Sequence, residues 1–212
     1  GNDRAITKWL DQSGNTNNAG QGTANAKPTY AANTLNGMGV VRFTSAQSLD
    51  ITSSNDFSTV IAVMNQASGQ SAETKPLGSN IFATTSAGKF GMKRQGSAWM
   101  DSGISSHSPA LITMQLHPGN YAVYVNGMNK GSGTDPVAPT SATKVGNDFA
   151  GDIAELIAYN TALSEGVRHK VEGYLAHKWG LAGSLPSTHT YKVGKPAFGG
   201  AQVLTFQPLS DE

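Results

Sequence analysis

The sequence predicts an all-β protein in which two antiparallel sheets pack face to face and one helix follows near the C-terminus. The first observation behind this prediction is composition: of 212 residues, only 14% are charged and 25 are glycine, and Ser, Thr and Asn are frequent. Such a mixture is typical of short strands joined by tight turns. The second observation is pattern. About a dozen strand-length runs are separated by turn residues, and a single helical periodicity occurs late in the chain.

The first half of the chain alternates polar loops with strand-length runs. Residues 11–28 form a loop rich in Asn and Gly, which favour turns. Residues 57–64, FSTVIAVM, are almost continuously apolar and indicate a central strand covered on both faces. Residues 65–78 are expected to be a loop. Further strands are expected at 29–30, 39–43, 49–51, 80–84, 88–94 and 97–100, with an Asn-Gly turn at 36–37.

The clearest hairpin is predicted at residues 110–116 and 121–125, and a second Asn-Gly turn follows at 126–127. In its second strand, Tyr121, Val123 and Val125 face one way, while Ala122 and Tyr124 face the other. Residues 132–143 are expected to be a loop, and residues 144–149 lead into the last strand.

Residues 151–179 organise the rest of the chain. An apolar run from Ile153 to Tyr159 predicts a strand, and Ser164 is expected to cap the following helix with its hydroxyl. Gly180 is expected to end this helix in a left-handed conformation. We expect the helix to be clamped on the end of the β domain, with Trp9 and Trp179 in the core near it. The stripe of the helix that faces the core is predicted to contain Val167, Val171, Tyr174, Leu175, Lys178 and Trp179.

Charge, apolar runs and cysteine content argue against several classes of partner and site. The formal charge of +1 gives no reason to expect nucleic acid, and no run of 18 apolar residues predicts a membrane span. Cysteine is absent, which excludes disulfides and thiolate metal sites. The chain begins with Gly1 and lacks a signal-peptide pattern, so we expect a processed product, a fragment or part of something longer.

Five segments together resemble a known family. They are WLDQSGNTNNA (9–19), KPTYAANTLNGMGVVRF (27–43), YVNG (124–127), GDIAELIAYNTALS (151–164) and VEGYLAHKWGLAGSLPSTHTYK (171–192). They resemble bacterial and phage domains of the concanavalin A-like lectin/glucanase superfamily, of the laminin G-like jelly-roll type. The resemblance implies a jelly-roll sandwich over residues 1–192. Members of the superfamily bind glycans or proteins, cleave polysaccharides, or serve as virion and adhesin parts.

The chain departs from that family at both ends. Only eight residues precede Trp9, where family members usually carry a further strand, and a missing strand would leave an exposed sheet edge. Residues 193–212 extend past the family's usual end and contain VLTFQ (203–207), which has the character of a strand. We expect this extension to fill the vacant edge or to pair with a neighbouring chain.

No catalytic pattern is found, so we expect a protein that is not an enzyme. Glycoside hydrolysis needs two opposed carboxyl groups, which the glucanases of the superfamily carry in an E-x-D-x-E pattern that this chain lacks. Asp152 and Glu155 are expected on opposite strand faces, as a turn residue and as a strand-end or edge contact. The histidines form no tight ligand cluster by spacing, and we interpret them as solvated surface groups.

A glycan site and a calcium site are the two candidate sites. Trp99 could stack on a sugar ring, with Asp101, Arg94 and Gln95 beside it to contact hydroxyls. The alternative for Trp99 is a buried core residue. Some laminin G-like domains hold Ca²⁺ at the sandwich rim, and Asp101, Asp148 and Asp152 supply the hard oxygen ligands it prefers. The alternative for these three residues is ordinary turn aspartates.

The sequence therefore predicts a non-enzymatic recognition domain. The expected partner is a glycan or cell-surface polysaccharide, and the expected location is the exterior of a cell or virion. The alternative is a structural module of a phage particle or surface filament that contacts neighbouring protein subunits.

Overall fold

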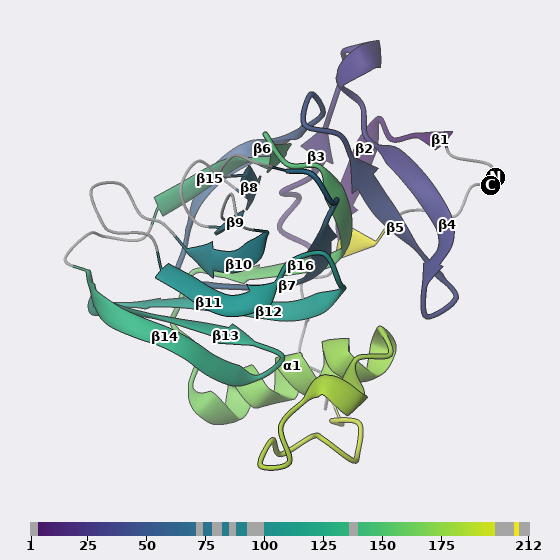
Figure 1. Ribbon diagram of the computed structural model, residues 1–212. Coiled ribbons are helices and arrows are strands. Elements are labelled where there is room, and N and C mark those ends of the chain that lie inside the picture. Colours follow the sequence, from purple (N-terminus) through teal and green to yellow (C-terminus); the bar gives the residue numbers. More distant parts are fainter. Residues whose placement is uncertain are drawn as a thin grey trace.

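The computed structural model describes residues 4–70, 74–77, 82–84, 88–92, 100–135, 140–197 and 206–207. These residues form a sandwich of two antiparallel sheets with one α-helix, which confirms the predicted fold class (Figure 1). The helix is α1 (Glu165–Lys178), and short 3-10 helices occur at Ala24–Ala26 and Ala182–Ser184. No helix within these described ranges combines the length and apolar character that a membrane crossing requires.

Among the described residues, the first sheet has eight strands, and all neighbouring strands in it are antiparallel. Its order is β1 (Arg4–Ala5), β4 (Thr29–Leu35), β5 (Met38–Phe43), β16 (Gly151–Tyr159), β7 (Thr59–Gln66), β12 (Ala110–His117), β13 (Gly119–Val125) and β14 (Met128–Asp135).

The second sheet has nine strands within the same described ranges. At one edge β17 (Phe206–Gln207) pairs with β2 (Lys8–Asp11), with Phe206 opposite Asp11. Residues 203–205 of the expected C-terminal strand lie outside the described residues. The order is β11 (Met100–Ser105), β10 (Lys89–Met92), β9 (Phe82–Thr84), β8 (Thr74–Leu77), β15 (Thr140–Asn147), β6 (Leu49–Phe57), β3 (Ala19–Gly20), β2 (Lys8–Asp11) and β17 (Phe206–Gln207).

Both Asn-Gly turns close hairpins as predicted. At the β4–β5 turn, Asn36 and Gly37 have φ of 49° and 74°, and Leu35 pairs with Met38. At the β13–β14 turn, Asn126 and Gly127 have φ of 51° and 75°. Two consecutive left-handed residues match the twist of the flanking strands, which explains why Asn-Gly selects this turn.

Some segments predicted as loops are strands. Residues 74–77 form β8, and β14 and β15 extend into the segment 132–143. The prediction was wrong there because β14, MNKGSGTD, has no apolar alternation. Its glycines are needed for packing instead: a Cβ on Gly131 would lie 2.0 Å from the Met100 sulfur, and one on Gly133 would lie 2.7 Å from the Tyr121 hydroxyl.

The space between the two sheets holds the larger of two apolar cores. Side chains of both sheets meet there, including Phe43 from β5, Leu49 from β6 and Ile112 from β12. Trp9 from β2 is 1% exposed in this core, so the expectation that it packs near the helix was wrong. Tyr121, Val123 and Val125 also face this core, as predicted.

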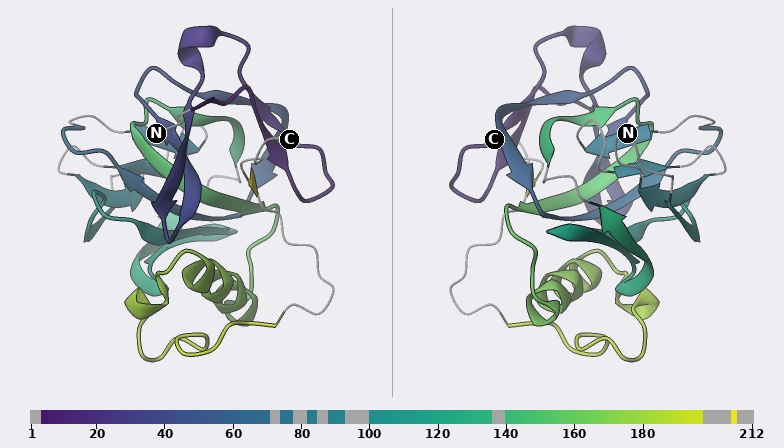
Figure 2. Two further views of the ribbon diagram at one scale, coloured as in Figure 1. Left: turned by 90° about the vertical axis from the view of Figure 1, so that its right-hand side faces the viewer. Right: turned by 90° about the vertical axis from the view of Figure 1, so that its left-hand side faces the viewer.

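The second core lies between the eight-stranded sheet and α1. Figure 2 shows the helix lying along the outer face of that sheet, so the expectation of a helix on the end of the domain was wrong. Strand β7 is covered on both faces as predicted, because Val60 and Ala62 face the first core while Ile61 and Val63 face the second.

The helix itself follows the predicted pattern with two differences. Val171, Leu175 and Trp179 are buried in the second core, but Val167 is 46% exposed and does not belong to it. Ser164 occupies the N-cap position with extended backbone, but its side chain makes no capping hydrogen bond. Gly180 ends the helix with φ of 74°, as predicted.

Candidate functional site

The predicted glycan contacts fall mostly outside the described residues: Trp99, Arg94 and Gln95 lie in the segment 93–99. Asp101 is exposed on β11, and its Oδ1 accepts a hydrogen bond of 2.8 Å from the backbone N–H of Gly103. The glycan role of these four residues stays a prediction.

The three aspartates proposed for calcium are not brought together. Asp148 is exposed in a turn with φ of 54°, and Asp152 on β16 accepts two hydrogen bonds, of 2.7 and 2.9 Å, from Arg42 on β5. Across the described part of the chain, the group of three metal-ligating side chains with ligand atoms within 4.8 Å of one another is His169, Glu172 and His189. Asp101, Asp148 and Asp152 therefore do not form one ligand set.

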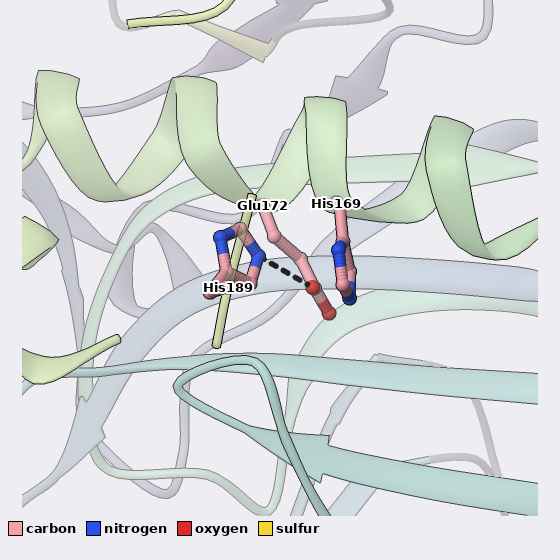
Figure 3. A group of neighbouring side chains, drawn as sticks. All are labelled: His169, Glu172 and His189. Atoms are coloured by element: carbon pink, nitrogen blue, oxygen red, sulfur yellow. Dashed lines mark hydrogen bonds and ion pairs between the residues drawn. The ribbon is translucent and has the colours of Figure 1, made fainter. Parts of the chain in front are cut away.

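The cluster of His169, Glu172 and His189 joins α1 to the segment that follows it. Figure 3 shows the two imidazole rings beside the Glu172 side chain, and the ring centroids lie 4.3 Å apart. His189 Nε2 lies 3.3 Å from Glu172 Oε2, and His189 Nδ1 accepts the Tyr191 backbone N–H at 3.2 Å. The ring proton of His189 therefore lies on Nε2 and points to Glu172.

The Glu172 carboxylate is saturated by protein donors. Arg168 Nη1 lies 3.0 and 2.8 Å from its two oxygens, and the Thr113 hydroxyl from β12 donates to Oε1 at 2.7 Å. The Arg168 guanidinium also stacks on Tyr124 of β13, 3.7 Å from the ring centre. A divalent cation would have to displace the guanidinium and the Nε2 proton, so these residues do not fit a metal site. The arrangement instead links the helix to the sheet through charged hydrogen bonds.

The expectation that the histidines are solvated was wrong for His189, which is 3% exposed. Burial lowers the pKa of His169, and the nearby positive charge of Arg168 lowers it further. The sequence contains one signal for this network, the i,i+4 spacing of Arg168 and Glu172, but nothing in it indicated that His189 would meet them across a loop.

A pocket lies where the β4–β5 hairpin meets the C-terminal end of α1. Its volume is about 230 Å³. The lining residues come from both elements and are Tyr30, Asn33, Gly37, Met38, Gly39, Lys178 and Trp179. Asn36 Nδ2 at the hairpin tip donates to the Lys178 carbonyl at 2.9 Å, so the two walls are joined at one end.

A β-bulge shapes the hairpin wall of this pocket. The pairing register of β4 with β5 shifts between Ala31 and Leu35, and Asn33 within that stretch has φ of 52°. A non-glycine residue in the left-handed region is uncommon, and bulges of this kind redirect side chains next to functional sites. The bulge accounts for the position of the Asn33 amide in the pocket lining.

Glycine at position 39 is required by the ring of Tyr30. A Cβ on Gly39 would lie 2.2 Å from the Tyr30 ring, so the ring rests directly on the β5 backbone. The aromatic wall of the pocket is thereby fixed against a strand.

A buried ion pair supports the helix wall. Glu155 of β16 is fully buried, and its Oε2 accepts hydrogen bonds from Lys178 Nζ at 2.8 Å and from Trp179 Nε1 at 2.7 Å. Lys178 Nζ also lies 3.2 Å from the Tyr174 hydroxyl. Burial raises the pKa of the Glu155 carboxyl, and the Lys178 charge opposes that rise. Glu155 thus holds both Lys178 and Trp179 in place at the pocket.

The expected place of Glu155 at a strand end or edge was wrong, and so was its expected face. A register shift between Ile153 and Glu155 interrupts the alternation of β16: Ile153 and Leu156 face the core between the sheets, whereas Ala154 and Glu155 both face the helix. Asp152, paired with Arg42, lies on that same outer face. Strict alternation could not reveal this bulge.

Sequence reasoning missed this pocket as a whole. Lys178 and Trp179 were expected only in the core-facing stripe of the helix, and Tyr30 and Asn33 received no role in a site. The available signal was the Asn-Gly turn, which predicts a hairpin but not its contact with a helix 142 residues later.

The comparisons with known proteins show the fold. No protein family matches the chain, and no curated protein matches it either. Domain 4 of AbnA, a GH43 extracellular arabinanase from Geobacillus stearothermophilus solved in complex with arabinotriose, is similar with a TM-score of 0.54 and 16% identity, over 77% of this chain and 97% of that domain. A GH54 α-L-arabinofuranosidase is similar with a TM-score of 0.50 and 14% identity, over 80% of this chain and 50% of that one.

A third similar structure is the enzymatically active domain of tailspike protein 2 from bacteriophage CBA120, with a TM-score of 0.49 and 13% identity. The match covers 85% of this chain and 31% of the tailspike chain. At such identities the likenesses to the arabinanase domain and the arabinofuranosidase establish a shared β-sandwich fold and nothing about the ligand.

Proposed function

We propose that this chain is a carbohydrate-recognition domain of the laminin G-like, concanavalin A-like type that binds glycans on the exterior of a cell or virion without cleaving them. The observation that carries the proposal is the pocket between the β4–β5 hairpin and α1, because two aromatic residues, an asparagine and a lysine line one small concave site.

These groups match the chemistry of a sugar. An aromatic ring packs on the apolar C–H face of a sugar, and amide and ammonium groups bond its hydroxyls. Tyr30 supplies a ring fixed against β5, Asn33 supplies an amide that both donates and accepts, and Lys178 supplies donors held by Glu155.

The same pocket supports binding over cleavage. Glycoside hydrolysis requires two carboxyl groups on opposite sides of the scissile bond. The described lining contains no carboxylate, and the Oε2 atom of the adjacent Glu155 is bonded by Lys178 and Trp179. We therefore propose recognition as the function.

The test is a glycan array followed by calorimetric titration. Arabino-oligosaccharides are the first ligands to try, because the similar AbnA domain was solved with arabinotriose. Asn33→Asp removes the amide donors but tolerates a left-handed backbone, and we expect it to weaken binding by about tenfold, which is the cost of one or two lost hydrogen bonds.

The matched control is Asn126→Asp, since Asn126 is a second left-handed asparagine and lies at the other hairpin. Its side-chain oxygen accepts the Leu111 N–H, which a carboxylate can also do, so binding should be unchanged. Absence of binding to every glycan, together with ordered assembly of the chain into particles or filaments, would support the structural-module alternative instead.

A further inference from the structure

We infer that the hairpin–helix pocket receives one uncharged sugar ring at the end of a glycan, and not an internal segment of a polysaccharide. This inference rests on the proposed function and specifies the class of ligand that the site selects.

The small size of the pocket, and the contact between its two walls at one end, argue for a single ring. Its volume of about 230 Å³ lies below the range of roughly 300–1,000 Å³ typical of sites for drug-sized ligands. The Asn36 bond to the Lys178 carbonyl joins the two walls at the hairpin tip. An internal segment must leave the site in two directions and would need a groove open at both ends.

The donors at the pocket suit sugar hydroxyls. The Lys178 ammonium has three N–H groups, two of which are directed to Glu155 Oε2 at 2.8 Å and to the Tyr174 hydroxyl at 3.2 Å. The third is left to donate to a ligand. Together with the Asn33 amide, it offers hydrogen-bonding groups for the hydroxyls of one ring.

The charges at the pocket favour an uncharged sugar. The single cation in the described lining is Lys178, and the buried Glu155 carboxylate lies 2.8 Å from it. The ion pair has no net charge, so a ligand carboxylate would gain little attraction from Lys178 and would be repelled by Glu155. Glu155 is thus a positioning residue that also determines specificity, although it does not line the pocket.

The first experiment compares ligand lengths by calorimetry. The probes are methyl α-L-arabinofuranoside, methyl β-D-galactopyranoside, methyl α-D-glucopyranoside and the corresponding trisaccharides. We expect the best methyl glycoside to bind within about fivefold of its trisaccharide and to compete with it, since contacts beyond one ring add little when the pocket holds one ring. Affinity that rises steeply with chain length and survives removal of the terminal residue would overturn the inference while leaving glycan recognition intact. Absence of binding by any sugar would overturn the proposed function itself.

The second experiment changes the charge at the pocket. Glu155→Gln keeps the size of the side chain and an oxygen that can accept the Trp179 N–H, but it leaves Lys178 without an opposing charge. We expect the preference for galactoside over galacturonate to fall by about tenfold or more in this variant. Glu165→Gln, on the same helix with an exposed side chain, should leave the preference unchanged. An unchanged preference in a folded Glu155→Gln variant, checked by circular dichroism, would contradict the assigned role of Glu155.

Discussion

At the scale of single residues, the pocket depends on Gly39, a glycine that is part of a strand and not of a turn. Gly39 lies inside β5, and the Tyr30 ring occupies the space where a side chain would begin. The predicted strand at 39–43 contained this glycine without indicating its purpose, because cross-strand contacts are not encoded in the pattern of one strand.

We expect Gly39→Ala to destabilise the protein by about 1–3 kcal/mol, as overpacking does, and to weaken glycan binding by displacing Tyr30. Urea denaturation and titration with the best ligand measure the two effects. Gly22→Ala is the matched control, since no atom lies within 4 Å of the Cβ position there. Equal stability of the two variants would contradict the proposed packing of Tyr30.

A second residue, His169, should make stability depend on pH. Because burial lowers its pKa in the folded state, the unfolded chain binds the proton more tightly. Stability is then full above the unfolded pKa of about 6.5 and is lost as the pH falls below it. We expect the melting temperature to decrease between pH 7.5 and 5.5, and His169→Gln to reduce that decrease.

His117→Gln, at an exposed position on β12, is the control for this pH effect and should keep the wild-type decrease. If His169→Gln and wild type lose the same number of degrees on acidification, another group is responsible.

At the scale of elements, α1 is held more by its contacts than by its sequence. Two glycines lie within it, and each lowers helix propensity by about 1 kcal/mol relative to alanine. The structure distinguishes them. A Cβ on Gly173 would lie 2.4 Å from the Tyr191 Cβ, whereas nothing lies within 4 Å of the Cβ position of Gly166.

The same substitution should therefore have opposite effects at the two sites. Gly166→Ala should stabilise the protein by about 0.5–1 kcal/mol through helix propensity. Gly173→Ala should destabilise it by about 1–3 kcal/mol, because the segment after the helix must move away. Urea denaturation midpoints compare them directly, and stabilisation by both would show that Tyr191 does not pack against the helix as described.

The network between the helix and the sheet also belongs to this scale. Arg168 and Glu172 on α1 are both buried and meet Thr113 from β12 and His189 from the following segment. Removing one member of a buried ion pair leaves the other charge uncompensated. We expect Glu172→Ala to cost about 3–5 kcal/mol, and Glu165→Ala, at an exposed position, to cost at most about 1 kcal/mol, both from urea denaturation.

At the scale of the whole molecule, the sequence predicted the layers better than their arrangement. Strand-length runs such as 57–64 and the two Asn-Gly turns predicted β7 and both hairpins, because these signals are local. The stripe of Val171, Leu175 and Trp179 predicted a helix with one buried face, but not which surface of the sheet would cover it. The site was missed because it joins Asn33 to Lys178 through a bulge, a turn and a helix end, and no local pattern relates them.

The two apolar cores share the strands of one sheet. Strands β7, β12 and β16 each contribute side chains to both cores, so the helix should not separate while the sandwich stays folded. We expect one unfolding transition, with coincident midpoints by far- and near-ultraviolet circular dichroism. A helical signal lost at lower denaturant would contradict this coupling.

The bond between Trp179 and Glu155 has a practical consequence. The Trp179 indole lines the pocket and is itself only 3% exposed, with its N–H fixed by a buried carboxylate. A sugar that enters the pocket changes the polarity around this indole, while Trp9 lies in the other core and is unaffected. In a Trp99→Phe variant, the intrinsic tryptophan fluorescence of this chain would then report, without a label, whether a sugar occupies the pocket.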